Sequence, residues 1–414
     1  MNSRKWPAVA IFLTNISLQI TIVTAFVCGP TFQRLFSLSQ TQLGVSLGAT
    51  NVGVLVMSLL IGHITYRFGP FRVLVWGLVT AVLGLALMLF AIGFWSLLVS
   101  LMLIGVASGI IRNANNTFLA DLFHDRLRQI MALAAGLWFS SSVISAPAIG
   151  AWLDMAQEYS LHVWSFRLPY TINMLLIGTC LVLVTSYLRP TAEKLKGHNP
   201  AGQHKPDPPG HGQKRAPTLP RWIPESIDRD TLWIVLLGFC HGWMVICLMA
   251  WTNPMVQAKF GANDFEGAML LAMISMGLAA GRFLIAAVRF KVDDRVILTV
   301  SGIAGGTVLA IGLSARTYLS TLITLSIGGL LISATVPCIL SLVARTFGRT
   351  KARAYGYMEA SVALAGLTGP SVVGVLADSG VTLWSALWIS PLAAGMLGFG
   401  SLLWKIRQAR RTLK

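Results

Sequence analysis

The chain has 414 residues, of which 55% are hydrophobic and only 11% are charged. Soluble globular proteins carry roughly 25% charged residues, so a chain this long and this apolar is expected to reside in a lipid bilayer. The net charge of +17 does not indicate a nucleic-acid-binding protein, because the basic residues sit in short clusters between apolar runs instead of on one domain.

Twelve apolar runs follow one another along the chain. They lie at residues 8–28, 42–63, 73–93, 96–119, 130–153, 168–188, 231–252, 266–288, 296–314, 318–341, 354–377 and 383–404. A hydrocarbon core about 30 Å thick needs roughly 20 apolar residues of helix, and a helix satisfies its backbone groups internally. The first run follows Arg4 and Lys5 as a signal peptide would, but the eleven similar runs behind it indicate a retained helix. The sequence therefore predicts an all-α polytopic membrane protein.

The basic residues predict the orientation of these helices. With the N-terminus in the cytoplasm, 26 of the 32 Lys and Arg residues fall in cytoplasmic segments. Four fall in outer loops: Arg34, Arg167, Lys259 and Arg316. Cytoplasmic loops are enriched in Lys and Arg, and one missed helix would reverse every later loop. We therefore expect a multi-pass protein of the cell (inner) membrane with both termini in the cytoplasm.

A polar stretch divides the runs into two sets of six. Residues 198–212 are rich in Pro and Gly and cannot bury a core, so we interpret them as part of a solvated linker. The predicted domains are a six-helix bundle at 1–188, a cytoplasmic linker at 189–230 and a second six-helix bundle at 231–414. The linker histidines 198, 204 and 211 do not have the spacing of a defined metal site, and the five cysteines form no CxxC pair. We expect no metal and no cofactor.

The two halves repeat each other at an offset near 224 residues. The matches include Pro30 with Pro254, Gln33 with Gln257, Phe36 with Phe260, Gly53 with Gly277 and Phe123 with Phe347. Pro147 and Gly150 likewise have counterparts in Pro370 and Gly374. A near-constant offset over five helices predicts two pseudo-symmetric bundles. Many secondary transporters place a central site between repeats of this kind.

The loop after the second run resembles a signature of the major facilitator superfamily. Gly62, Arg67, Phe68, Gly69 and Arg72 fit that signature, whereas Tyr66 stands where the family has an aspartate. In the family this acid steadies the closed cytoplasmic face. The resemblance therefore implies a gating role for Gly62, Arg67, Gly69 and Arg72, with a latch that is altered or absent. It also implies the twelve-helix fold of that superfamily and transport by alternating access.

Ionisable residues inside the apolar runs are few, and each is a candidate functional group. Their insertion costs about 2.5–3.5 kcal/mol at a helix centre. Arg282 is a candidate for gripping an anionic solute, because guanidinium pairs bidentately with carboxylate; transporters of monocarboxylates and oxalate in the superfamily resemble this chain in the Gly-Arg step. Alternatively, Arg282 reaches the cytoplasm or forms a gate with Glu359. Arg112 stands beside Asn113, Asn115 and Asn116. This polar cluster either forms a hydrogen-bond network near the cytoplasmic gate or contacts the solute.

Glu359 and His241 are candidates for proton coupling. Glu359 lies about six residues into the eleventh run, so it either carries a proton or pairs with Arg345, Arg349 or Arg353. His241 is near the middle of the seventh run, where imidazole titrates near neutral pH if unperturbed or donates a hydrogen bond in a cavity. Because helices 1, 4, 7 and 10 line the cavity of the superfamily, the resemblance implies further solute contacts at Asn15, Gln19, Asn113, His241 and Trp243.

The first functional hypothesis is a secondary transporter, coupled to protons, for a small polar or anionic organic solute such as a carboxylate or amino acid. The alternative is a proton-driven exporter of amphipathic compounds, such as drug-like or siderophore-type solutes. A sensor built on a transporter fold is a third. No P-loop, HExxH or dinucleotide-binding motif occurs in a suitable context, so we expect no enzyme activity. The expected partners are a small-molecule substrate, protons and the lipid bilayer, and we expect a monomer that binds no nucleic acid.

Overall fold

The structure is a computed structural model that describes residues 5–122, 127–162, 164–189, 229–287, 292–347 and 351–412. A few side chains inside the helices, that of Tyr66 among them, also lie outside the description. Phe123 and residues 190–228, which hold most of the predicted linker and its three histidines, are outside it too. Within the described residues twelve helices are long and apolar enough to cross a membrane, which confirms the predicted all-α fold.

The N-terminal helices are α1 (Lys5–Val27), α2 (Gly29–Phe36), α3 (Gln40–Phe68), α4 (Pro70–Leu89), α5 (Phe94–Leu122), α6 (Leu127–Glu158), α7 (Trp164–Leu183) and the π-helical turn η3 (Val184–Leu188). The C-terminal helices are α9 (Arg229–Phe260), α10 (Asp264–Ala287), α11 (Asp294–Ser314), α12 (Tyr318–Ile332), α13 (Thr335–Phe347), α14 (Lys351–Asp378), α15 (Leu383–Ala386) and α16 (Ile389–Thr412). The short helix α2 was not predicted from the sequence.

Two of the twelve spans are interrupted. The span Tyr318–Phe347 consists of α12 and α13, which meet at Ser333. Pro337 lies in the first turn of α13, and a proline has no N–H to donate to the residue four positions earlier, so the break falls one turn before it. The last span begins with the four-residue helix α15 and continues as α16.

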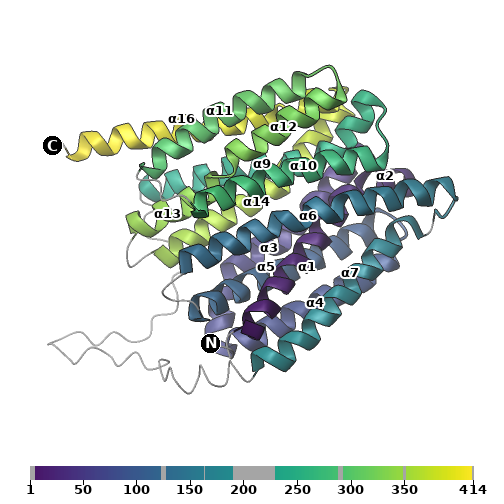
Figure 1. The fold of residues 1–414 in the computed structure, drawn as a ribbon, viewed down its shortest axis with the longest axis horizontal. Helices are drawn as coiled ribbons and strands as arrows, with labels where there is room; N and C mark the ends of the chain where they lie inside the picture. Colours follow the sequence, from purple (N-terminus) through teal and green to yellow (C-terminus); the bar gives the residue numbers. More distant parts are fainter. Residues whose placement is uncertain are drawn as a thin grey trace.

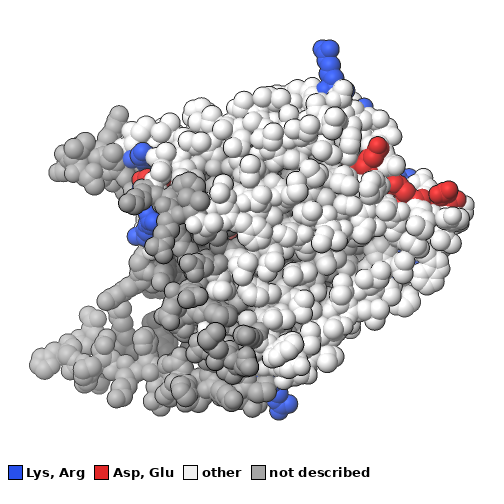
Figure 2. Space-filling view, viewed as in Figure 1, with Lys and Arg blue, Asp and Glu red and all other residues white. Residues whose placement is uncertain are grey.

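Both described ends of the chain lie on the left of Figure 1, and α2 lies on the right. We call these the termini end and the α2 end of the molecule. Helices α1–α7 occupy one half of the view and α9–α16 the other. Figure 2 shows that the charged side chains of this face gather near its two ends, with a broad uncharged surface between them. This is the pattern expected where lipid tails surround a protein.

The repeat is visible in how the helices pack. Gly105 of α5 lies so close to α3 that a Cβ atom there would overlap the carbonyl group of Thr50. Gly329 of α12, 224 positions later, also lies close to α10, where a Cβ atom would be 2.7 Å from the carbonyl oxygen of Ile274. Ile274 is itself 224 positions after Thr50. Small residues let membrane helices approach closely, and the two halves use the same pair of positions to do so.

Candidate functional site

At the α2 end, two aspartates join the halves in the same way. The carboxylate of Asp154, at the end of α6, accepts hydrogen bonds from the backbone N–H groups of Asp264 and Phe265 at 2.9 and 3.0 Å. These are the first residues of α10 in the other half. A carboxylate at a helix N-terminus satisfies unpaired N–H groups and interacts favourably with the helix dipole. Asp154 therefore fastens the second half of the molecule to the first.

The carboxylate of Asp378 repeats this contact in the opposite direction. It lies at the end of α14 and accepts hydrogen bonds from the N–H groups of Gln40 and Thr41, the first residues of α3, at 3.0 and 2.8 Å. Asp378 is 224 positions after Asp154, and Asp264 is 224 positions after Gln40. Neither aspartate was among the functional candidates predicted from the sequence. The repeat offset was the signal that pairs them.

Further polar contacts tighten the α2 end. The carboxylate of Asp264 accepts hydrogen bonds from Arg34 at 2.7 Å and from Gln257 at 2.6 Å. The amide of Asn253 in α9 donates to the carbonyl oxygen of Val27 in α1 at 2.8 Å. Since Arg34 and Val27 belong to the first half and Asp264 and Asn253 to the second, the two halves are held together at this end by side chains of both.

Nearer the middle of the helices, an ion pair crosses between the halves. Arg112 of α5 and Glu359 of α14 approach to 2.6 Å. Their side chains are 35% and 33% exposed although both lie well inside membrane-spanning helices, so solvent-sized space adjoins the pair. Among the described side chains, the partner of Glu359 is thus Arg112 and not Arg282 or Arg345, whereas the side chains of Arg349 and Arg353, which were also predicted as partners, lie outside the description. Arg345 instead lies 3.4 Å from Asp294.

Arg282 is buried where α10 packs against α6. It is 8% exposed, and its guanidinium carbon lies 4.4 Å from the centre of the Phe139 ring. Among the described residues its one hydrogen bond is long, 3.5 Å to the carbonyl oxygen of Ala135, and its Nε has no partner there. Arg282 is close enough to interact electrostatically with both Arg112 and His241. No described carboxylate lies within ion-pair distance of it.

The polar residues of α1 contact neighbouring helices of the first half. Asn15 accepts a hydrogen bond from Asn115 of α5 at 2.9 Å, and Gln19 donates to Ser142 of α6 at 2.9 Å. Asn113 does not join them: its amide donates to the carbonyl oxygen of Gly109 in its own helix. The predicted cluster around Arg112 is therefore divided, with Asn115 directed to α1 and Arg112 to the other half.

His241 and Trp243 lie in α9 and contact two different helices. The Nδ1 atom of His241, a buried residue, is 2.9 Å from the hydroxyl of Thr335 at the start of α13. The indole N–H of Trp243 donates to the hydroxyl of Thr368 in α14 at 2.9 Å. Both partners are in the second half, so these two side chains brace α9 within its own bundle.

The predicted gating residues of the loop after α3 lie at the termini end. Arg67 is exposed and sits 5.4 Å over the ring of Phe68. Gly69 has φ = 81°, a conformation that suits glycine, and joins α3 directly to α4. Arg72 is exposed in the first turn of α4. Gly62 lies within α3, and its surroundings are outside the described residues.

The sequence profile of the Major Facilitator Superfamily matches residues 7–313 of this chain. The chain belongs to the major facilitator superfamily. It is accordingly a multi-pass membrane transporter with twelve spans and not an enzyme. No curated protein matches this member of the superfamily.

Solved structures of the superfamily share its fold. A crystal structure of the transporter FucP in the outward conformation has a TM-score of 0.64 and 17% identity, covering 97% of this chain and 99% of that one. A variant of the E. coli fucose:proton symporter FucP has a TM-score of 0.64 and 16% identity over the same shares of both chains. At this identity the likeness concerns the fold alone.

Proposed function

We propose that this superfamily member carries a small polar or anionic organic solute, such as a carboxylate or an amino acid, across the membrane by alternating access coupled to protons. The solute would bind between the two halves near Arg282, Arg112 and Glu359. His241, Asn15, Gln19 and Trp243 would form the surrounding wall, with Asn113 further from the centre because its amide is directed to its own helix.

The observation that supports this proposal most is the net charge of Arg112, Arg282 and Glu359, which we call the central cluster. Arg112 and Arg282 interact electrostatically, yet only one described carboxylate, Glu359, pairs with either of them. Among the described side chains, two guanidinium groups and one carboxylate leave one positive charge inside the membrane. An uncompensated buried charge is costly, and an anion seated against Arg282 would neutralise it. Guanidinium binds carboxylate bidentately, which favours a carboxylate-bearing solute.

Glu359 is the proposed proton carrier. Its ion pair with Arg112 joins α5 to α14 across the two halves. Protonation of Glu359 would remove the charge that holds Arg112 and would thereby loosen this contact. FucP, whose fold is similar, is named a fucose:proton symporter, so proton coupling has a precedent on this architecture.

The Asp154 and Asp378 contacts are the proposed gate at the α2 end. Both join the N-terminus of a helix in one half to a carboxylate of the other, and both must break for the halves to separate there. With the termini in the cytoplasm, as we propose from the distribution of Lys and Arg, this structure would be closed toward the outside. Arg67, Gly69 and Arg72, together with Gly62, would then belong to the opposite, cytoplasmic gate.

Export of amphipathic compounds is the competing function. A flux assay distinguishes the two: protein in liposomes is offered labelled carboxylates and amino acids with and without an imposed pH gradient. The proposal predicts accumulation of an anionic solute that follows the gradient. Uptake that ignores the gradient would remove proton coupling, and transport restricted to neutral or cationic amphipathic compounds would favour the exporter.

A further inference from the structure

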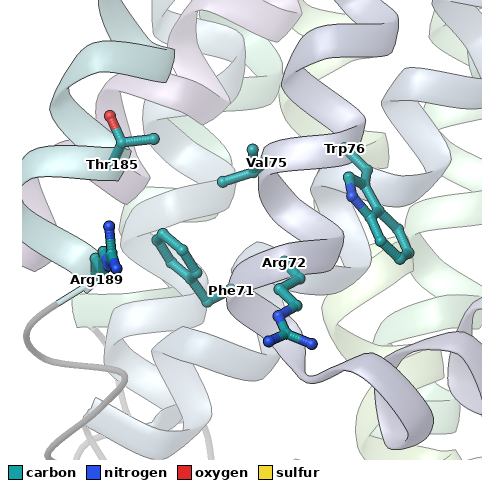
Figure 3. A pocket seen from close by; sticks show the side chains of 6 residues that line it. All are labelled: Phe71, Arg72, Val75, Trp76, Thr185 and Arg189. Atoms are coloured by element: carbon teal, nitrogen blue, oxygen red, sulfur yellow. The ribbon is translucent and has the colours of Figure 1, made fainter.

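A small hollow lies at the termini end of the first half, away from the central cluster. It has a volume of about 190 Å³. The residues that line it are Phe71, Arg72, Val75 and Trp76 of α4 with Thr185 and Arg189 at the end of the sixth span. Figure 3 shows Arg72 and Arg189 on opposite sides of the Phe71 ring, with Val75 and Thr185 deeper along the two helices. The hollow thus combines an apolar floor with a rim that carries two positive charges.

The hollow continues into an apolar surface on the outside of the bundle. Along α4 the exposed side chains are Trp76, Val79, Leu83 and Leu87, which recur at the spacing of one helix face. On α7, which packs against α4, the exposed large apolar side chains include Ile172, Leu175, Leu176 and Val182. These residues belong to membrane-spanning segments, so the surface below the two arginines faces lipid tails.

We propose that this hollow binds the headgroup of an anionic phospholipid. Arg72 and Arg189 would hold the phosphate, since guanidinium forms charge-assisted, bidentate hydrogen bonds with phosphate oxygens. The acyl chains would lie along the apolar surface of α4 and α7. Trp76 is 46% exposed at the junction of the two regions, and an indole ring suits the boundary between headgroups and tails.

Three features favour a lipid over a soluble phosphate compound. The hollow adjoins the lipid-facing surface, and its floor is apolar, which a small soluble anion would not use. Basic pockets between membrane helices on the cytoplasmic side bind acidic headgroups, and the proposed orientation places this hollow on that side. The first turn of α4, which holds Arg72, adds the positive end of the helix dipole, which attracts a phosphate from either source.

Native mass spectrometry of the full-length detergent-solubilised protein tests this site. The protein is titrated with phosphatidylglycerol and with phosphatidylcholine of the same acyl chains. We expect one phosphatidylglycerol to bind more tightly than phosphatidylcholine, and Arg72→Gln or Arg189→Gln to weaken it roughly fivefold each, from the attraction of one arginine near a charged headgroup. The double variant with lysine at both positions, which keeps the charges, should retain most of the preference.

The matched control is Arg316→Gln. Arg316 lines a second hollow, at the α2 end, which has no other basic residue in its lining. This variant should bind phosphatidylglycerol as the unaltered protein does. Equal binding of the two lipids, unchanged binding by the Arg72→Gln, Arg189→Gln double variant, or displacement of the lipid by soluble glycerol phosphate would each overturn the proposal.

Discussion

Asp154 and Asp378 occupy equivalent positions in the two halves, 224 residues apart, and each binds the first two backbone N–H groups of a helix in the opposite half. The two contacts are reciprocal: α6 holds α10, and α14 holds α3. A carrier that alternates between two states has to break and remake both. They are therefore the most direct points at which to alter its conformational balance.

Replacing these carboxylates should favour opening of the α2 end. Asparagine retains one acceptor oxygen and loses the charge. Asp154→Asn or Asp378→Asn should therefore each destabilise the closed state by roughly 1 kcal/mol relative to the open state, which changes the ratio of the two populations about fivefold. Spin labels on Glu158→Cys and Ser379→Cys, both exposed at this end, report the separation of the halves. The five native cysteines are buried. The population with the longer distance between the two labels should increase in each single variant, and it should increase most in the double variant.

Asp293→Asn is the matched control for this measurement. Asp293 also caps a helix, accepting a hydrogen bond from the N–H of Arg295 at 2.8 Å, but it does so within the second half. It should leave the distance distribution unchanged. If Asp154→Asn and Asp378→Asn also leave the distances unchanged, the contacts of these two aspartates do not keep the α2 end closed.

Glu359→Gln should separate transport from the pH gradient. Glutamine has the shape of a protonated glutamate and cannot release a proton, so solute exchange across the liposome membrane should persist while accumulation driven by the gradient is lost. The control is Glu266→Gln. The Glu266 carboxylate lies at the α2 end and accepts a hydrogen bond from the backbone N–H of Asn263, so this variant should still accumulate solute. Accumulation that survives in Glu359→Gln would exclude Glu359 as the proton carrier.

The close approach of helices at Gly105 predicts a stability loss on a minimal substitution. An added methyl group would meet the backbone of Thr50, which cannot turn aside as a side chain would, so Gly105→Ala should destabilise the protein by roughly 1–3 kcal/mol. Gly329→Ala should do the same in the second half. Gly178→Ala in α7, where nothing lies within 4 Å of the new Cβ, should be neutral or slightly stabilising. Thermal unfolding in detergent compares the three.

Hydropathy and charge were sufficient to predict the twelve spans, because lipid requires continuous apolar helices and the distribution of Lys and Arg constrains their number. The helix break before Pro337 had a local signal that was not used. Helix α2 (Gly29–Phe36) was not predicted, because it is short and amphipathic and a search for long apolar runs does not detect such a helix.

The site was only partly predictable from the sequence. Arg112, Arg282 and Glu359 were recognised because charges within membrane helices are rare. Their partners were not, because Arg112 and Glu359 are 247 residues apart and only the packing of α5 and α14 brings them together. Asn113 was expected beside Arg112 from its position in the sequence, yet one residue along a helix turns a side chain by about 100°, which directs the two to different neighbours.

The most direct test of the account is a thermal-shift screen of the purified protein against small anionic, neutral and cationic metabolites, repeated with Arg282→Gln. Arg295→Gln is the control, since Arg295 also lies over an aromatic ring, 4.8 Å from the centre of Trp404, but within the second half. We expect anions to stabilise the unaltered protein and Arg295→Gln and to have no effect on Arg282→Gln. Stabilisation by cations or neutral amphipathic compounds that Arg282→Gln leaves unchanged would contradict it.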